Sequence, residues 1–503
     1  MINIKRGKRT KSLCPECLRV IDARVFENEG QIKIEKTCLE HGTFDDIYWS
    51  DSGLLLKHMK YLRDGTKVKD PMTERRKGCP YDCGLCPEHK SPTILTNIDV
   101  TNRCNMRCPI CFANASVQGY LYEPTKDQIV NMMLTVRNER PIPCSVLQFS
   151  GGEPTVREDL PELIRIAKEL GFSQVQIATN GLKLARSVEY VKKLKKSGLN
   201  TVYLQFDGIN EKPYIEARGF NALPLKLRAI ENCRKAGLDS IVLVPTLVRG
   251  VNDDQIGSLI NFSVKNSDVV RSLNVQPVSF AGRINKNELK KMRITIPDFL
   301  KLIEEQTNGA ITKEDFYPVS AVGIVSDFLE LWEKNPVPVP SCHPACGTAT
   351  FVFVDNGKLV PITRFIDVEG FLELTKDIIE ESDTKGKIGK IRALAKLSTE
   401  FLKLVDFDIM PKSSNIPKII MKIMKEGNKD VLAELFESTL FIGCMHFQDL
   451  YNIDKERIQR CVIHYAVPDG RVIPFCTYNL LYREEVERRF STPLYNSEFR
   501  KND

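Results

Sequence analysis

Short runs rich in β-branched residues alternate with helical stretches between residues 93 and 280. The runs are ILTNIDVT, VLQFS, VQIATN, TVYLQFD, IVLVPTL and LNVQPVS, and helices are predicted at 125–138, 158–170, 185–197, 222–236 and 254–266. Six strand–helix repeats of this kind predict a parallel sheet. Right-handed crossovers would curl the sheet into a partial (β/α)6, TIM-like barrel, with functional residues at the carboxyl ends of its strands.

Two cysteine-rich regions flank this series, so the predicted fold is an α/β core with a small domain on each side. Residues 1–92 are expected to form a cysteine-rich metal-binding domain, and residues 93–285 the core. Residues 286–503 contain the predicted hairpins FVFVDNGKLVPI and CVIHYAVPDGRVIPFC, with helices between them. We expect this third region to carry further metal ligands and to contact the substrate.

The chain has 16 cysteines, most of them clustered. Its first residues, MINIKRGKRTKSLCPEC, lack the apolar segment of a signal peptide, and no run of 18 apolar residues predicts a membrane-spanning helix. We therefore expect a soluble, cytoplasmic protein whose clustered cysteines bind metals instead of forming disulfides. Cys144 and Cys233 stand apart from the clusters and are interpreted as buried hydrophobic residues.

Cys104, Cys108 and Cys111 form a C-x3-C-x2-C motif directly after a predicted strand. Three thiolates can hold three irons of a [4Fe–4S] cluster, whose fourth iron is then open to another ligand. A zinc knuckle is the alternative interpretation of three cysteines alone. The motif SGGEP at 150–154 ends the second predicted strand.

These two motifs resemble those of the radical S-adenosylmethionine superfamily, whose signature is C-x3-C-x-Φ-C, with Ile110 as the apolar residue Φ. The resemblance implies that S-adenosylmethionine chelates the open iron and that one electron from the cluster releases a 5′-deoxyadenosyl radical, which abstracts hydrogen from a C–H bond. It also implies cofactor-binding roles at strand ends for Ser150, Gly151, Gly152, Glu153, Pro154, Thr179, Asn180, Gln205, Asp207, Arg249 and Gln276.

The first forty residues contain two facing knuckles, C-x2-C and C-x2-H. Cys14 and Cys17 form the first, and Cys38 and His41 form the second. Four such ligands suit one tetrahedral metal ion. Zinc and mononuclear, rubredoxin-like iron fit this spacing equally well.

Cys79, Cys83 and Cys86 repeat the C-x3-C-x2-C spacing. No long strand precedes them, and no strand–helix series follows at the right place. We interpret them as ligands of an accessory centre. Its fourth ligand is either His89 or a cysteine elsewhere.

A further set of cysteines lies close to the two predicted hairpins of the C-terminal region. This arrangement is similar to the accessory-cluster domains of many radical enzymes. Four of the five could bind a second [4Fe–4S] cluster, and one would be spare or next to the substrate. The five are Cys342, Cys346, Cys444, Cys461 and Cys476.

The segment 385–425 carries ten basic and three acidic residues, a net charge of +7. The formal net charge of the whole chain is also +7. Solvated helices over the core are one interpretation of its mixed lysine and aliphatic pattern. A peripheral surface for anionic lipid headgroups is the other. Binding to nucleic acid is not expected, because few aromatic residues are interspersed with the basic ones.

The order of all the cysteine blocks, with MHFQDLYNID and CVIHYAVPDGRVIPFCTYN, resembles the tetraether lipid synthases of archaea. The resemblance implies carbon–carbon coupling between terminal methyl carbons of phytanyl chains in archaeal diether phospholipids, which gives tetraether lipids and macrocyclic archaeol. Two S-adenosylmethionine molecules would be cleaved per bond, with electrons from a low-potential donor such as a ferredoxin. Our hypothesis is that an accessory cluster held by Cys342, Cys346 and Cys476 retains the first alkyl radical on a sulfur atom.

Several other functions fit part of the pattern. The nearest is a radical methylase of a pterin cofactor, which needs no lipid tunnel. A peptide-modifying radical enzyme would normally add a peptide-recognition domain, which is not recognisable here. A multi-cluster electron carrier would not need SGGEP, and a zinc-ribbon nucleic-acid binder would contain zinc without sulfide.

Overall fold

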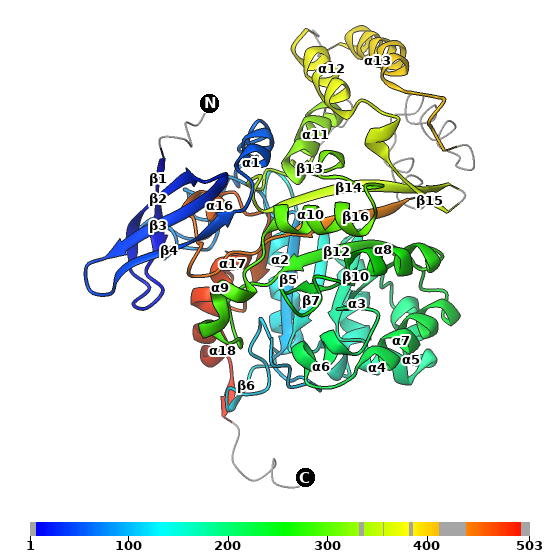
Figure 1. Cartoon of the computed structure of the whole chain (residues 1–503). Coiled ribbons are helices and arrows are strands. Elements are labelled where there is room, and N and C mark those ends of the chain that lie inside the picture. Colours follow the sequence, from blue (N-terminus) through cyan, green and yellow to red (C-terminus); the bar gives the residue numbers. More distant parts are fainter. Residues whose placement is uncertain (1–6, 331–335, 356, 382–385, 412–438, 494–503) are drawn as a thin grey trace.

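A four-stranded antiparallel sheet forms the N-terminal unit of the computed structural model, which describes residues 7–330, 336–355, 357–381, 386–411 and 439–493 (Figure 1). Its strands follow one another in the sheet: β1 (Lys8–Leu13), β2 (Val20–Asn28), β3 (Gln31–Cys38) and β4 (Gly42–Trp49). Alternate residues of β3, Ile32 and Ile34, are fully buried with Trp49. Helix α1 (Ser52–Met59) then begins at Asp51, whose side chain accepts from the Leu54 amide.

Six parallel strands and their covering helices form the core, as predicted. The strands are β5 (Leu95–Thr101), β7 (Val146–Gly151), β8 (Gln174–Thr179), β9 (Thr201–Gln205), β10 (Ile241–Val244) and β12 (Val270–Pro277). The helices are α2 (Lys126–Arg137), α3 (Leu160–Glu169), α4 (Leu182–Arg186), α5 (Val188–Lys196), α6 (Lys212–Arg218), α7 (Leu223–Lys235) and α8 (Ile256–Lys265). The helix predicted at 185–197 is divided, because Ser187 is extended and caps α5.

Apolar faces of the helices bury one side of this sheet. Ile98 and Val100 of β5 share a core with Ile129 of α2 and Leu163 of α3. Helix α2 starts with a capping box between Thr125 and Gln128, and its apolar residues recur at helical spacing. The α/β fold expected from the alternating pattern is therefore confirmed.

Strands from the C-terminal region extend the sheet at both edges (Figure 1). β16 (Leu440–Met445) lies parallel beside β12, and β17 (Ile463–Ala466) lies parallel beside β5. Eight neighbouring strands are thus parallel, in the order β17-β5-β7-β8-β9-β10-β12-β16. The boundary expected at residue 285 therefore does not separate two independent sheets.

The remaining elements surround this extended sheet, and both predicted hairpins are present. The first pairs β14 (Gly347–Asp355) with β15 (Lys358–Pro361), and the second pairs β17 with β18 (Val472–Pro474). The other strands are β6 (Tyr120–Leu121), β11 (Thr246–Leu247), β13 (Tyr317–Pro318) and β19 (Thr492–Pro493). The other helices are α9 (Leu289–Met292), α10 (Ile296–Gln306), α11 (Val322–Glu330), α12 (Val368–Glu381), α13 (Lys387–Phe401), α16 (Lys455–Gln459), α17 (Phe475–Thr477) and α18 (Arg483–Arg489).

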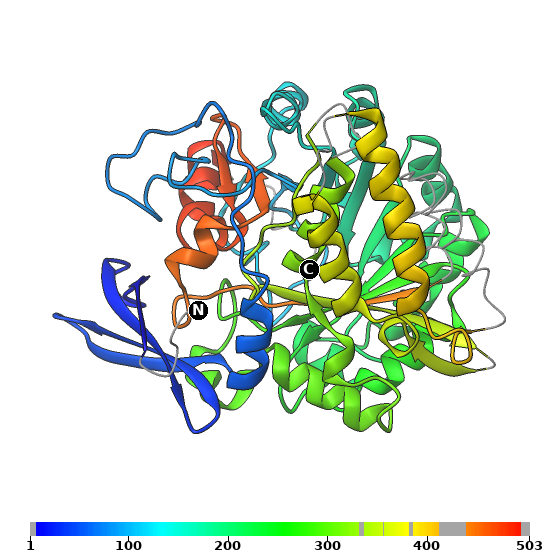
Figure 2. The same ribbon diagram turned by 90° about the horizontal axis from the view of Figure 1, so that it is seen from above.

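Part of the basic segment lies in helix α13, which runs beside α12 at the top edge of the molecule in Figure 1 and faces the viewer in Figure 2. Its Lys396 pairs with Glu381, and Lys403 pairs with Glu400, so these charges are partly balanced at the surface. The rest of the segment, 412–438, lies outside the described residues. Among the helices that the structure describes, none has the length and apolar character needed to cross a bilayer.

Candidate functional site

The loop that carries Cys104, Cys108 and Cys111 begins where β5 ends. Hydrogen bonds hold the backbone of each cysteine. Ser116 Oγ accepts from the Cys104 amide at 2.9 Å, Arg283 Nε donates to the Cys108 carbonyl at 2.7 Å, and Cys111 exchanges two backbone hydrogen bonds with Arg283. The loop is therefore shaped by the chain itself.

These three thiols do not form a compact set of ligand atoms for a single tetrahedral ion. A single tetrahedral zinc brings its sulfur ligands to about 3.8 Å from one another, given Zn–S bonds of about 2.3 Å. Among the described residues, one set of ligand atoms lies entirely within 4.8 Å, and it does not include these cysteines. Burial raises the pKa of the Cys104 thiol to about 12, and the charge of Glu153 adds to the shift. Cationic iron would offset that cost, so the donor set fits an iron–sulfur cluster.

The two glycines of SGGEP pack directly against the start of the cysteine loop. The Gly152 amide donates to the Thr101 carbonyl at 2.7 Å. A Cβ on Gly151 would lie 2.2 Å from the Thr101 oxygen, and one on Gly152 would lie 2.3 Å from the Arg103 oxygen. Gly151 also has φ +128°, which side chains rarely adopt. Both positions therefore require glycine for the contact between β7 and the loop.

Glu153 joins the ends of β7 and β8. One carboxylate oxygen accepts from the Thr179 hydroxyl at 2.7 Å and from Thr155, and the other accepts from the Asn180 amide at 2.7 Å. The Asn180 side chain donates to Asn105 Oδ1 in the cysteine loop. Pro154 begins the short turn η2 (Pro154–Val156) that follows. These predicted residues therefore do come together beside Cys104.

Asp207 is also close to the loop, but another side chain occupies its carboxylate. Arg218 donates to both Asp207 oxygens, at 2.7 and 2.8 Å, and to the Ile110 carbonyl at 2.8 Å. Both side chains are buried. We therefore infer that Asp207 orients Arg218, which in turn positions the loop between Cys108 and Cys111.

The structure separates the other predicted cofactor contacts. Gln205 accepts from the buried Lys226 at 2.9 Å, and Gln276 donates to the Tyr203 hydroxyl at 3.0 Å, so both lie on the inner side of the sheet. Arg249 points elsewhere, because it pairs with Asp298 and donates to the Arg293 carbonyl. The prediction that Arg249 contacts the cofactor therefore has no support in its geometry.

The side of the sheet that the helices leave uncovered is polar. Gln148 Nε2 donates to Asn97 Oδ1 at 2.7 Å, and Gln176 Nε2 donates to Gln148 Oε1 at 2.7 Å, which links β5, β7 and β8. Across the sheet, Asn274 also donates to Tyr203. The Asn97 amide nitrogen and the Asn274 amide oxygen are buried without a partner among the described residues. Amides left in this way are suited to a polar ligand.

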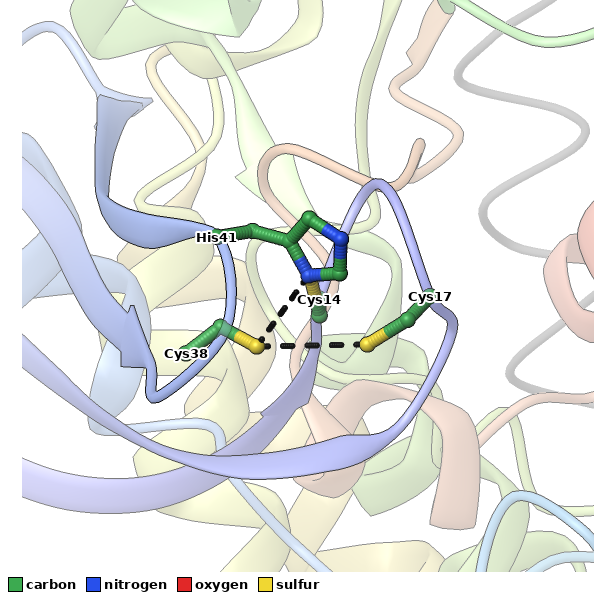
Figure 3. Close-up of side chains that lie close together, drawn as sticks. All are labelled: Cys14, Cys17, Cys38 and His41. Atoms are coloured by element: carbon green, nitrogen blue, oxygen red, sulfur yellow. Dashed lines mark hydrogen bonds between the residues drawn. The ribbon is translucent and has the colours of Figure 1, made fainter.

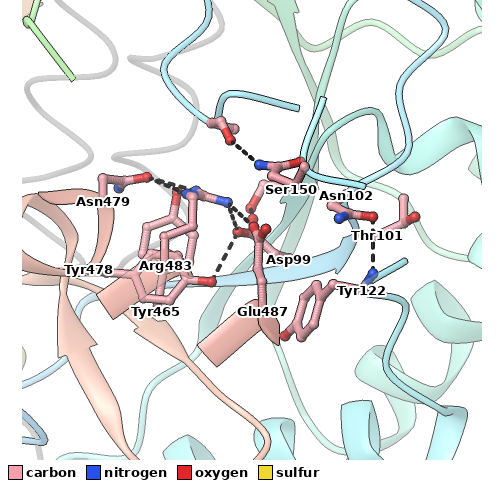
Figure 4. Close-up of polar contacts among 12 residues, drawn as sticks. Asp99, Thr101, Asn102, Tyr122, Ser150, Tyr465, Tyr478, Asn479, Arg483 and Glu487 are labelled. Carbon is pink, nitrogen blue, oxygen red and sulfur yellow. Dashed lines mark hydrogen bonds and ion pairs between the residues drawn. The ribbon is translucent and has the colours of Figure 1, made fainter. Parts of the chain in front are cut away.

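A buried ion pair joins this inner side to the C-terminal helix α18 (Figure 4). Arg483 donates to Asp99 at 2.6 Å and to Glu487 at 3.1 Å, and all three side chains are at most 9% exposed. The other Asp99 oxygen accepts from the Ser150 hydroxyl at 2.8 Å. Arg483 also lies over the ring of Tyr478. The SGGEP segment is therefore connected to α18 through Asp99.

The predicted N-terminal metal set is assembled (Figure 3). The four ligand atoms of Cys14, Cys17, Cys38 and His41 all lie within 4.8 Å of one another. Nδ1 of His41 is 3.7 Å from Cys14 Sγ and 3.5 Å from Cys38 Sγ. The hydrogen bond from His41 lowers the pKa of the Cys38 thiol to about 6. This geometry fits one tetrahedral metal ion.

Replacing Cys17 by serine is expected to remove one metal equivalent per chain and to unfold the β1–β4 sheet. Metal binding supplies on the order of 10 kcal/mol to the folding of such small units. Elemental analysis and limited proteolysis would measure both effects. Thr37→Ala, in the same sheet but outside the ligand set, is the control. A Cys17→Ser variant that keeps its metal and its protease resistance would contradict the assignment.

The five C-terminal cysteines separate into four and one. Cys346 accepts from Arg457 Nε at 3.3 Å, and Cys476 accepts from the Gln448 amide at 3.3 Å. Burial is the main reason that the pKa of the Cys342 and Cys461 thiols is raised, and the charge of Cys346 adds to both shifts, so these thiols are electrostatic neighbours. Arg457 is 1% exposed, and its Nη1 has no partner among the described residues. Four thiols around a buried cation fit an accessory cluster.

Cys444 does not belong to this group. It lies on β16, is fully buried, and packs within the hydrophobic core. Burial alone raises the pKa of its thiol. The prediction that Cys444 is a metal ligand is therefore not supported, and it is the spare cysteine of the five.

Stacked aromatic rings connect the cysteine loop with the four C-terminal cysteines. Phe112, next to Cys111, stacks on Phe475, next to Cys476, with ring centroids 5.5 Å apart. Phe447 stacks on the same Phe475 ring at 4.1 Å. The two groups of cysteines are thus neighbours in space although 365 positions separate Cys111 from Cys476 in the chain.

Two known sequence families match the first two regions of the chain. Residues 98–263 match the Radical SAM superfamily, and residues 7–50 match the HMPTM N-terminal zinc ribbon domain. The first match covers the cysteine loop, SGGEP and the parallel strands from β5 to β10. The second covers the four ligands of the N-terminal metal set.

One relative is similar along nearly the whole chain. The 7,8-dihydro-6-hydroxymethylpterin dimethyltransferase of Methanocaldococcus jannaschii is 56% identical over 490 residues, which cover 97% of this chain and 96% of the relative. Other relatives match the core alone. The GTP 3′,8-cyclase of Clostridium acetobutylicum is 26% identical over 43% of this chain and 65% of its own length, and the Fe-coproporphyrin III synthase of Methanosarcina barkeri is 33% identical over 36% and 40%.

Proposed function

Because the chain belongs to the radical S-adenosylmethionine superfamily, and within it to the family of the M. jannaschii pterin dimethyltransferase, we propose that it methylates a reduced pterin. The near full-length match to that enzyme carries the proposal. It spans the N-terminal metal unit, the core and the C-terminal region together. The proposed substrate is 7,8-dihydro-6-hydroxymethylpterin, and two methyl groups are added to it.

The resemblance to tetraether lipid synthases led to a wrong prediction. It rested on the order of the cysteine blocks, and the long, high-identity match to a pterin dimethyltransferase overturns it. The alternative function given with it, a radical methylase of a pterin, is the better interpretation. The hypothesis that an accessory cluster retains an alkyl radical is withdrawn with it.

The polar inner side of the sheet supports a pterin over a lipid. A pterin ring presents several ring nitrogens, an amino group and an oxo group, all of which need hydrogen-bond partners when buried. The amide ladder of Asn97, Gln148 and Gln176, with Asn274 opposite, offers both donors and acceptors. A phytanyl chain would leave the Asn97 amide nitrogen and the Asn274 amide oxygen desolvated and unpaired, which costs about 1–3 kcal/mol for each group.

Arginine side chains hold the loop that would bind the cofactors. A [4Fe–4S] cluster with S-adenosylmethionine supplies a 5′-deoxyadenosyl radical when both are bound to the loop of Cys104, Cys108 and Cys111. Arg218 and Arg283 hold the loop carbonyls in place. A low-potential electron donor, such as a ferredoxin, would reduce the cluster.

The proposal predicts a dimethylated pterin. We would express the chain in host cells that make 7,8-dihydro-6-hydroxymethylpterin, with methyl-deuterated methionine in the medium, and follow pterins by mass spectrometry. The expected product has gained two methyl groups, and its label shows whether they come from S-adenosylmethionine. A parallel anaerobic assay of the purified chain with a strong reductant would measure 5′-deoxyadenosine.

One outcome would contradict the proposed substrate without contradicting the radical activity. Formation of 5′-deoxyadenosine without methylated pterin in cells or in vitro would contradict the pterin assignment and leave the radical enzyme intact. Cells that express a variant with alanine at Cys104, Cys108 and Cys111 are the control and should contain no methylated pterin.

A further inference from the structure

The thiols of the N-terminal C-x3-C-x2-C motif share a small cavity with an imidazole. Cys79, Cys83 and Cys86 line this cavity together with His89. A turn places the histidine there, because the His89 amide donates to the Cys86 carbonyl at 2.9 Å. Ile458 and Pro474 from the C-terminal region also line the cavity. Three thiols and one imidazole are thus available to one bound group.

The hydrogen bonds of His89 define which ring nitrogen carries its proton. Nε2 of His89 lies 2.9 Å from the Cys461 carbonyl oxygen. A carbonyl oxygen can only accept, so Nε2 must be the protonated nitrogen of a neutral ring. Nδ1 therefore keeps a free lone pair.

The next residues in the hydrogen-bonded chain lead to the same tautomer. The Thr93 hydroxyl donates to Glu139 at 2.7 Å, so it accepts from Nδ1 of His464, which lies 3.0 Å away. A neutral His464 protonated at Nδ1 has a bare Nε2. That nitrogen lies 3.1 Å from Nε2 of His89 and shares the His89 N–H with the Cys461 carbonyl in a three-centre hydrogen bond. The hydrogen bonds on both sides of His89 thus place its proton on Nε2.

From this arrangement we infer that Nδ1 of His89 is the fourth ligand of a [4Fe–4S] cluster held by Cys79, Cys83 and Cys86. A metal-bound histidine usually donates its second N–H to a carbonyl or carboxylate, which fixes the ring and its tautomer. The bond from Nε2 to the Cys461 carbonyl has that form. This cluster then has no iron open to S-adenosylmethionine, although its cysteine spacing is identical to that of the catalytic loop.

A neutral imidazole in place of a thiolate also changes the electrochemistry of the cluster. It removes one negative charge from the ligand set, which raises the reduction potential, as histidine ligation does in other iron–sulfur proteins. The cluster beside His89 would therefore be reduced more easily than a four-cysteine cluster in the same cavity.

The test is spectroscopic and uses the full chain with alanine at Cys104, Cys108 and Cys111, which removes the catalytic cluster. Samples are prepared with ordinary and with 15N-labelled histidine, reduced, and examined by pulsed EPR. We expect a nitrogen coupling that changes with the label. His89→Cys should keep the iron content, lose the coupling and lower the reduction potential. His58→Gln, a buried histidine on α1 outside all cysteine sets, should retain the coupling.

Three results would overturn the inference. One is the absence of a histidine coupling in the parent protein. Another is a coupling that persists in His89→Cys, which would place the nitrogen ligand at another histidine. The last is a change in the EPR spectrum of the parent on addition of S-adenosylmethionine, which would show that one iron is open.

Discussion

Replacing Cys108 by alanine will abolish the formation of 5′-deoxyadenosine by the purified chain. Two remaining thiolates cannot hold a [4Fe–4S] cluster in this loop. Loss of even an outer partner of a metal ligand costs about 10–100-fold, so loss of a ligand should exceed on the order of 100-fold. Chromatography of anaerobic reactions with S-adenosylmethionine and a strong reductant would measure the change, and iron analysis should show one cluster fewer.

Cys233→Ala is the matched control for this experiment. Cys233 is 1% exposed on α7, and burial raises the pKa of its thiol to about 12, so it behaves as a small core residue. Its removal should cost some stability, about 1 kcal/mol for a methyl-sized cavity, and leave the cleavage rate unchanged. If Cys108→Ala still cleaved S-adenosylmethionine, the catalytic cluster would lie elsewhere, and the Cys79 set would be the next candidate.

The core and its cysteine loop could be predicted because their signals are local. Alternation of strand and helix patterns sets β5 to β12, and the motif at Cys104 follows the first strand directly. The N-terminal metal set was also visible, because two short knuckles need only one hairpin to meet. Distant pairings carry no comparable signal. The parallel contact of Ile463 with Leu95 joins segments far apart in the chain, so β17 could be predicted as a hairpin strand but not as a neighbour of β5.

Two expectations depended on which way strand residues face in the folded sheet. Cys444 was grouped with the accessory ligands by proximity in sequence, and only the placement of β16 inside the sheet shows that its side chain belongs to the core. A lipid substrate was expected although the sequence carried a contrary signal. Asn97 and Asp99, then Gln148 and Ser150, recur at every second residue of two strands, which predicts one polar side of the sheet.

The buried ion pair between Asp99 and Arg483 joins distant parts of the chain, and no motif in the sequence predicts it. Arg483 was one residue of the charged run REEVERR, which reads as a solvated helix face. In the structure its guanidinium lies between Asp99 and Glu487 and over two tyrosine rings. Because Asp99 also binds Ser150, this pair holds α18 to the strand ends that carry the site.

Replacing Arg483 by methionine is therefore expected to cost about 3–5 kcal/mol of unfolding free energy at pH 7.5, the usual penalty for leaving a buried carboxylate without its partner. Two carboxyl groups, Asp99 and Glu487, would then face each other with no cation. Arg488→Met is the control on the same helix, because Arg488 and Glu484 are more than 60% exposed and such pairs contribute less than about 1 kcal/mol. Denaturant unfolding of the anaerobic protein would measure both.

The pH dependence of this penalty tests its electrostatic origin. Burial already raises the pKa of Glu487 in the native protein, and removal of Arg483 should raise it further. A folded-state pKa above the unfolded value means that stability is lost as the pH rises through the folded pKa. The variant should thus approach wild-type stability below pH 5 and fall behind it at pH 8, and the double variant Asp99→Asn, Arg483→Met should recover part of the loss. A penalty that stays the same between pH 5 and 8 would show that packing on the tyrosine rings, and not charge, holds α18 in place.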